Sequence, residues 1–147
     1  MKQSAAELLL EYRVPAQVNR LKDVRRALRE VLRRHGVSAA CARDVVMAVD
    51  EACQNIIRHA YGGEGKGEIV LCVRSTLSQL ELVLRDFAPA VDPACIHPRP
   101  LDELRPGGLG THLIREAMDE VEYLRPSDGT GNLLRLVKRL EPDHRGS

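Results

Sequence analysis

A long helix with two different faces is the feature that most constrains how this chain can fold. Apolar side chains between residues 39 and 60 recur at spacings of three and four, which places them along one side of a helix. They are Val45, Val49, Ala52, Cys53, Ile56 and Ala60. Glu51, Asn55 and His59 recur every four residues and so follow one another along a second face. Such a polar row lines a functional site in some proteins and is an ordinary solvated surface in others.

Both ends of this helix are marked in the sequence. Ser38 immediately precedes it and belongs to the residue types that cap helix N-termini. Four glycines, at positions 62, 63, 65 and 67, end it in a flexible turn. This glycine run is not a dinucleotide-binding fingerprint, because no strand precedes it and no helix follows it.

The remaining patterns predict an α+β fold. Strands are expected at 8–14, 68–74, 80–86, 120–124 and 132–139, where apolar or alternating residues are bounded by turn residues. Helical spacing is expected at 16–36, up to the stop at Gly36, and again after residue 110. The elements do not alternate strictly between strand and helix. We therefore expect a two-layer sandwich in which a mixed, mostly antiparallel sheet carries its helices on one face.

The size and charge of the chain exclude several classes of protein. With 147 residues it is long enough for one domain, which we expect to be ordered from about residue 8 to residue 140, with a flexible tail at 141–147. The 22 Lys and Arg residues are balanced by 21 Asp and Glu, and aromatic residues are few, so neither nucleic acid nor a membrane is indicated as a partner. No apolar run reaches membrane-spanning length, and no secretory signal is recognisable.

The cysteines indicate a reducing compartment. They stand at positions 41, 53, 72 and 95 without a Cys-x-x-Cys pair, and the first two share the predicted long helix, too far apart to bridge. We therefore expect buried free thiols in a cytoplasmic protein.

One face of the first predicted helix is basic. Its arginines stand at positions 20, 25, 26, 29 and 33. A solvated basic face is the common explanation for such a row. The alternative is a docking surface for an acidic protein partner, and the residue pattern leaves both open.

The segment 87–106 has no clear period and holds five of the eight prolines. A long loop within a compact domain is often a lid or a binding loop, and we expect a lid here. The loop leads into Gly107-Gly108-Leu109-Gly110, which predicts a glycine-rich turn immediately before a helix N-terminus. Unpaired backbone N–H groups and the helix dipole favour an anion at such a position.

Taken together, these motifs resemble those of the GHKL ATPase superfamily, which has the Bergerat fold. Within it they are most similar to the anti-sigma-factor serine/threonine kinases of bacterial partner-switching systems. The row Glu51-x-x-x-Asn55-x-x-x-His59 resembles the N box of that family, residues 85–93 its first glycine box, and residues 107–114 its second. Gly131-Asn132 leading into Leu136-Val137-Lys138 resembles the closing strand.

The resemblance implies ATP and Mg²⁺ as cofactors and assigns roles to particular residues. Glu51 is the expected catalytic base, Asn55 the expected Mg²⁺ ligand, and Asp86 the expected acceptor of a hydrogen bond from adenine. Further nucleotide contacts are expected from Ala88, Gly107, Gly108, Leu109, Gly110 and Thr111. His59 is expected to have a structural role at the end of the helix.

The resemblance also implies partners and leaves two functions open. The first is a protein kinase that binds a sigma factor and phosphorylates a serine of an anti-anti-sigma antagonist of the STAS type, with a homodimer implied by the family alone. The second is an adaptor of the same fold with weak or absent ATP binding. Ala88 and Ala90, which stand where the family commonly has glycine, favour the second, because a Cβ resists positive φ and close backbone approach.

Overall fold

The structure is a computed structural model that describes residues 6–65, 67–89 and 106–140, with the backbone alone at 106–111. Its strands are β1 (Glu7–Pro15), β2 (Glu68–Ser75), β3 (Gln79–Asp86), β4 (Glu120–Leu124) and β5 (Asn132–Arg139). Its helices are α1 (Leu21–Arg34), α2 (Ala39–Asn55) and α3 (Pro106–Ala117), with short 3₁₀ and π-helical turns at η1 (Val18–Arg20) and η2 (Ile56–Ala60).

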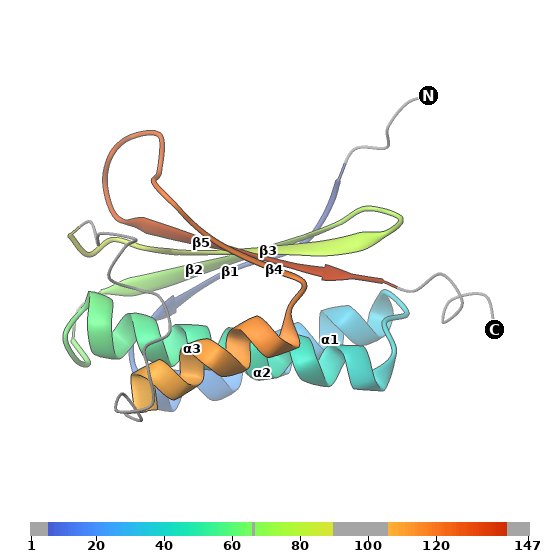
Figure 1. The fold of residues 1–147 in the computed structure, drawn as a ribbon, viewed down its shortest axis with the longest axis horizontal. Coiled ribbons are helices and arrows are strands. Elements are labelled where there is room, and N and C mark those ends of the chain that lie inside the picture. The colour runs from blue at the N-terminus through green and yellow to red at the C-terminus, as the bar shows by residue number, and fades with distance from the viewer. Residues whose placement is uncertain (1–5, 66, 90–105, 141–147) are drawn as a thin grey trace.

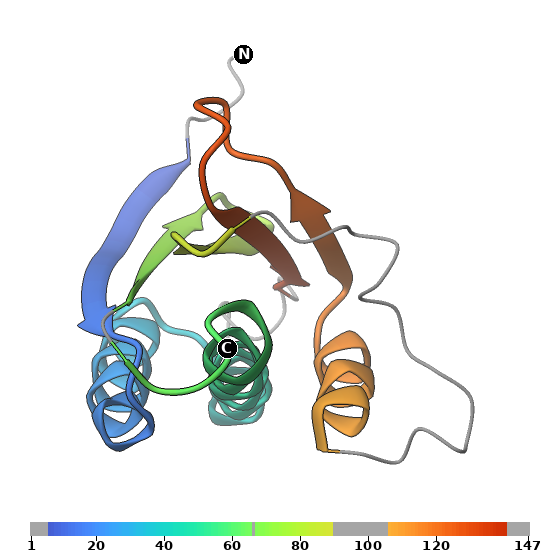
Figure 2. The same cartoon turned by 90° about the vertical axis from the view of Figure 1, so that its left-hand side faces the viewer.

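The strands form one five-stranded sheet in the order β1-β2-β3-β5-β4. All pairings between the described strands are antiparallel, so the sheet is more uniform than the mixed sheet that the sequence predicts. The three α-helices lie together on one face of this sheet (Figure 2). The predicted two-layer α+β architecture is therefore confirmed, and each predicted strand is present to within about two residues of its expected bounds.

The core lies between the sheet and the helix layer. Along β2 and β3 every second residue is buried, which is the period that a strand with one covered face requires. The largest fully buried side chains come from both layers and include Leu21, Leu28, Leu32, Val45, Leu71, Leu82, Leu84 and Leu136. Burial of these apolar side chains is the main force that holds α1 and α2 against the sheet.

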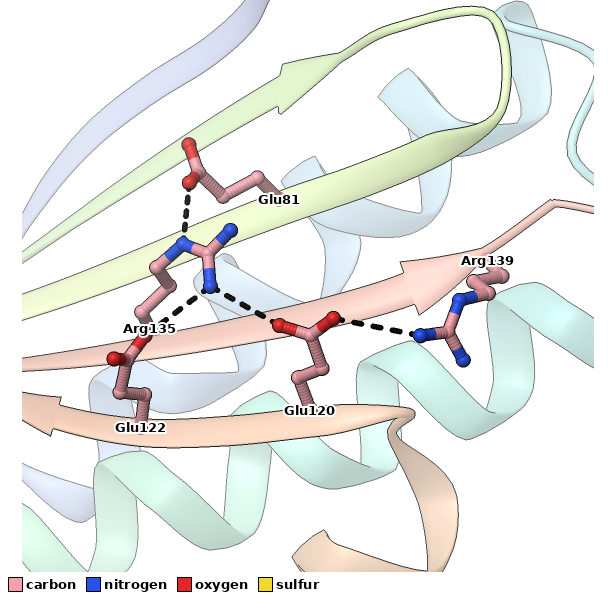
Figure 3. A network of polar contacts seen from close by, with 5 residues as sticks. All are labelled: Glu81, Glu120, Glu122, Arg135 and Arg139. Atoms are coloured by element: carbon pink, nitrogen blue, oxygen red, sulfur yellow. Dashed lines mark hydrogen bonds and ion pairs between the residues drawn. The ribbon is translucent and has the colours of Figure 1, made fainter.

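The uncovered face of the sheet is cross-linked by charge, as Figure 3 shows around Arg135 on β5. Its Nε donates to Glu81 of β3 at 2.6 Å, and its Nη1 donates to Glu120 and Glu122 of β4 at 3.3 and 3.2 Å. The hydrogen bond to Glu81 is the main reason that the pKa of Arg135 is raised. One guanidinium thus joins three neighbouring strands.

Helix α2 begins where the sequence predicts, because Ser38 Oγ accepts a hydrogen bond from the Cys41 N–H at 3.1 Å. Its end is different. The last predicted turn is π-helical, and Tyr61 N–H donates to Ile56 O at 3.0 Å, five residues back. A π turn holds more residues than an α turn, so the position of His59 relative to Glu51 and Asn55 differs from the one that ideal α-helical spacing predicts.

Helix α3 begins earlier than the sequence predicts. It starts at Pro106, so residues 107–110 lie in its first turns rather than in a turn before it. Proline is well suited to a first helical position, because its φ is preset and its missing N–H would have no partner there. The predicted lid at 87–106 otherwise lies mostly outside the described residues.

Two further expectations are that the cysteines are buried free thiols and that no segment spans a membrane. Cys53 is a free thiol in the core, and burial raises its pKa to about 12, which suits an unreactive, reduced cysteine. Among the described helices, none is both long enough and apolar enough to cross a membrane.

Candidate functional site

The predicted site residues come from elements that meet at one end of the molecule. Figure 1 shows the end of α2, the end of β3, the start of β5 and the start of α3 at this end. The register of the sheet explains part of the arrangement, since Asp86 is paired directly with Asn132 across β3 and β5. Packing of α3 against α2 explains the rest.

Asp86 is a buried carboxylate that is fixed on one side only. It is 3% exposed, and its Oδ1 accepts hydrogen bonds from Ala88 N–H at 3.0 Å and from Asn132 Nδ2 at 2.9 Å. Its Oδ2 has no hydrogen-bond partner within the described residues. The remaining oxygen is therefore available to accept a hydrogen bond from a ligand, such as the amino group of adenine.

Burial raises the pKa of Asp86 above its ordinary value, because desolvation disfavours the charged form. The hydrogen bonds from Asn132 and from Ala88 N–H act in the opposite direction. They hold the carboxylate in one orientation and favour its ionised form.

Ala88 does not have the conflict in φ that the sequence suggests. It is buried, and no described residue other than glycine has a positive φ, so its Cβ is compatible with its conformation. Its N–H is one of the two donors to Asp86. Ala90 lies outside the described residues.

The glycine that this site requires immediately precedes the neighbouring strand, β5. Gly131 has a φ of 78°, and a Cβ at this position would overlap the carbonyl oxygen of Asp86. Asn132, which follows it, donates to Pro89 O at 3.2 Å as well as to Asp86. In the sequence these two residues resemble part of a closing strand, and no local pattern indicates their role at the site, because their contacts join positions about 45 residues apart.

On α2, two adjacent carboxylates have different surroundings. Asp50 accepts hydrogen bonds from Arg25 Nη1 at 2.7 Å and from Gln54 Nε2 at 2.8 Å. Glu51 is half-buried and makes no hydrogen bond or ion pair within the part of the chain that the structure describes. Its carboxylate is therefore available to act on a bound substrate.

Asn55 is half-buried one turn beyond Glu51, and its Oδ1 accepts a hydrogen bond from Arg58 Nη2 at 3.2 Å. His59 is exposed and belongs to the π-helical turn that follows α2. The structure thus places Glu51 and Asn55 one turn apart on α2, and His59 on the π-helical turn that follows it.

The first turn of α3 supplies backbone donors. The first four N–H groups of a helix have no partner within the helix, and at this helix they include those of Gly107, Gly108 and Leu109. They suit a phosphate group. The contacts expected from these residues, from Gly110 and from Thr111 stay predictions.

A family model described as a histidine kinase-like ATPase domain matches residues 14–138. The chain belongs to this family. The GHKL resemblance inferred from the motifs is thereby confirmed, and a kinase-like ATPase domain supports ATP as the nucleotide.

Known relatives extend the comparison over almost the whole chain. Serine-protein kinase RsbW of Bacillus velezensis is 30% identical over 143 residues, which cover 92% of this chain and 89% of the relative. Serine-protein kinase RsbW of Staphylococcus epidermidis is 31% identical over 146 residues, which cover 93% and 92%. A chain in the crystal structure of the SiaB–SiaC complex from Pseudomonas aeruginosa has the same fold, with a TM-score of 0.61, 18% identity and 91% of both chains covered.

Asn132→Ala should raise the pKa of Asp86 further, because it removes a hydrogen bond to the charged form. The folded-state pKa of Asp86 is already above its unfolded value, so ionised Asp86 opposes folding at neutral pH and this cost disappears as the pH falls through the folded pKa. We expect the variant to lose about 1–3 kcal/mol of unfolding free energy at pH 7, with a smaller loss at acid pH. NMR titration of the Asp86 carboxyl and urea unfolding measure both quantities.

Asn19→Ala is the matched control, because Asn19 is exposed and lies outside the site. An unchanged Asp86 titration in Asn132→Ala would refute the role given to this hydrogen bond.

Proposed function

We propose that this protein is an ATP-dependent protein serine kinase that acts as an anti-sigma factor. Its substrate is a serine of an anti-anti-sigma antagonist of the STAS type, and a sigma factor is its second partner. The observation that carries the proposal is the pair of open carboxylates, Oδ2 of Asp86 and the side chain of Glu51, in a family of kinase-like ATPase domains. Relatives named serine-protein kinase over nearly the full length support the same activity.

The residues present are suited to Mg²⁺. Asn55 offers an amide oxygen, and within the described residues no group of three or more His, Cys, Asp or Glu could hold a metal. Mg²⁺ is often held by one or two protein oxygens together with phosphates and water, and it neutralises phosphate charge during transfer. Asn55 would therefore be its main protein ligand, once the Arg58 guanidinium leaves Oδ1.

Glu51 is the proposed general base. The hydroxyl oxygen of the substrate serine forms a bond to the γ-phosphorus of ATP while the bond between that phosphorus and the β–γ bridging oxygen breaks. The hydroxyl proton passes to the carboxylate of Glu51, and ADP leaves with the electron pair of the broken bond. Asp50 cannot take this part without losing its bonds to Arg25 and Gln54.

Glu51→Ala and the isosteric Glu51→Gln should lower the rate of phosphate transfer roughly 10²- to 10⁴-fold, because both remove the proton acceptor. Affinity for Mg·ATP should stay within about twofold. Transfer of radiolabel from ATP to candidate antagonist proteins, and isothermal titration with Mg·ATP, measure the two quantities.

Glu116→Gln is the matched control, since Glu116 is an exposed residue of α3 with no ion pair to a described residue. If both Glu51 variants transfer phosphate as fast as the wild type, Glu51 is not the general base. Absence of binding and of transfer in the wild-type protein at millimolar Mg·ATP would instead favour the non-catalytic adaptor.

A basic groove on the helix layer supports binding of a protein partner. It measures about 620 Å³, lies between α1 and α2, and has an apolar floor that includes Val46 and Met47. Its charged lining consists of Arg25, Arg29, Arg33, Arg43 and Asp50. Asp50 is occupied by Arg25, and neither Arg29 nor Arg43 forms an ion pair with a described residue.

The surplus of positive charge over an apolar floor fits an acidic segment with an apolar side. Of the two interpretations of the basic helix face, this surface favours docking. A docking surface of this kind would allow the protein to act as an anti-sigma factor whether or not it is an active kinase. A homodimer, which the family implies, is compatible with this groove and can be tested separately by sedimentation.

Arg29→Glu should weaken the complex with the antagonist or the sigma factor at least tenfold, because it places a like charge against an acidic segment. Affinity for Mg·ATP should not change. The cleanest control is Arg26→Glu, an exposed position on the same helix outside the groove. Equal partner affinities for the two variants would mean that these arginines form an ordinary solvated face and not a docking surface.

A further inference from the structure

We infer that Tyr61 is a positioning residue of the nucleotide site, and this inference rests on the proposed ATP-binding function. Its hydroxyl fixes the backbone immediately after Asp86, although the residue itself stands at the far end of the α2–η2 helix. Through this contact it sets the position of the carboxylate that is expected to bind adenine.

The Tyr61 hydroxyl makes two short hydrogen bonds to different strands. It donates to the carbonyl oxygen of Glu68 at the start of β2, at 2.7 Å. It accepts from the N–H of Phe87, the first residue after β3, at 2.8 Å. A single hydroxyl thus uses its donor and one acceptor position to tie the end of the helix to two adjacent strands.

The ring of Tyr61 is held in place by a close fit to Gly67. A Cβ at Gly67 would overlap the ring, and Gly67 does not have a positive φ, so space rather than backbone conformation requires glycine here. Gly67 is itself anchored, because its carbonyl oxygen accepts a hydrogen bond from Ala16 N–H at 2.8 Å. The contact with Gly67 therefore holds the ring in the position from which its hydroxyl reaches the Phe87 N–H.

The Phe87 N–H lies between the two residues that set the position of the proposed adenine-binding carboxylate. On one side is Asp86, and on the other is Ala88, whose N–H donates to Asp86 Oδ1. The side chain of Phe87 is 45% exposed, so burial of its ring does not hold this peptide. The hydrogen bond to Tyr61 does so, while Asn132 holds the Asp86 carboxylate from the opposite side.

Removal of the hydroxyl should affect nucleotide affinity more than catalysis. In Tyr61→Phe the ring still packs, but Glu68 O and Phe87 N–H lose their partner, and the segment that follows Asp86 becomes less ordered. We expect the Kd and the KM for Mg·ATP to rise about fivefold, as the loss of one ordinary hydrogen bond implies, with kcat within about twofold of wild type. Hydrogen exchange of the Phe87 amide should become faster.

The experiment compares Tyr61→Phe with Tyr12→Phe, by titration calorimetry with Mg·ATP, by phosphate transfer to an antagonist, and by amide exchange. Tyr12 is a half-buried tyrosine of β1 whose hydroxyl has no hydrogen-bond partner within the described residues, so it controls for loss of a hydroxyl as such. Gly67→Ala is a second variant that displaces the ring without removing the hydroxyl, and it should reproduce the loss of affinity.

The outcomes separate this inference from the proposed function. If wild-type protein binds Mg·ATP and Tyr61→Phe binds it equally well, with unchanged Phe87 exchange, Tyr61 is only a structural residue. If Tyr61→Phe lowers thermal stability and leaves KM unchanged, the same conclusion holds. Absence of Mg·ATP binding in the wild type would overturn the proposed ATP site itself, and this inference with it.

Discussion

The arrangement of this site depends on keeping one buried carboxylate at the end of the central strand. A buried charge without partners costs roughly several kcal/mol, so Asp86 requires donors that reach it at the point where β3 ends. The chain supplies one from the next turn, at Ala88, and one from the adjacent strand, at Asn132. Because these two share Oδ1, the second oxygen has no hydrogen-bond partner among the described residues. The same requirement explains Gly131, since β5 can approach the Asp86 carbonyl this closely only where no Cβ intervenes.

Most of the fold was predictable from local patterns, and the site only in part. The alternating burial of β2 and β3 and the Ser38 cap depend on residues that are near in sequence, so period and capping chemistry predict them. The roles of Gly131 and Asn132 depend on strands that meet only in the folded protein, and no local pattern shows that β5 lies beside β3. The π-helical turn and the start of α3 at Pro106 were missed because ideal helical spacing and the usual meaning of a glycine run both favoured the simpler alternative.

The alanine at position 88 shows that one reason for expecting glycine, a positive φ, does not apply in this structure. A departure from the glycine of related proteins suggests a damaged site where the glycine is needed for its φ or for a close approach of the backbone. Here the backbone is compatible with alanine, and the amide at this position still binds the carboxylate. The close approach that does need glycine is made by another strand. A motif therefore has to be judged by the contacts that its residues make in the structure and not by residue identity alone.

Helix α2 brings the separate parts of the protein together, because each of its faces meets a different environment. Val45 and Val49 face the core, Asp50 faces α1 through its bond to Arg25, and Glu51 is half-buried without a polar partner among the described residues. Adjacent residues on a helix point about 100° apart, so two carboxylates in succession can belong to different surfaces. Asp50 neutralises one arginine that lines the basic groove, whereas Glu51, the proposed catalytic base, has no such partner among the described residues. The proposed partner surface and the proposed catalytic base thus share one helix, and because they lie on different faces of it, either can be altered by substitution without changing the other.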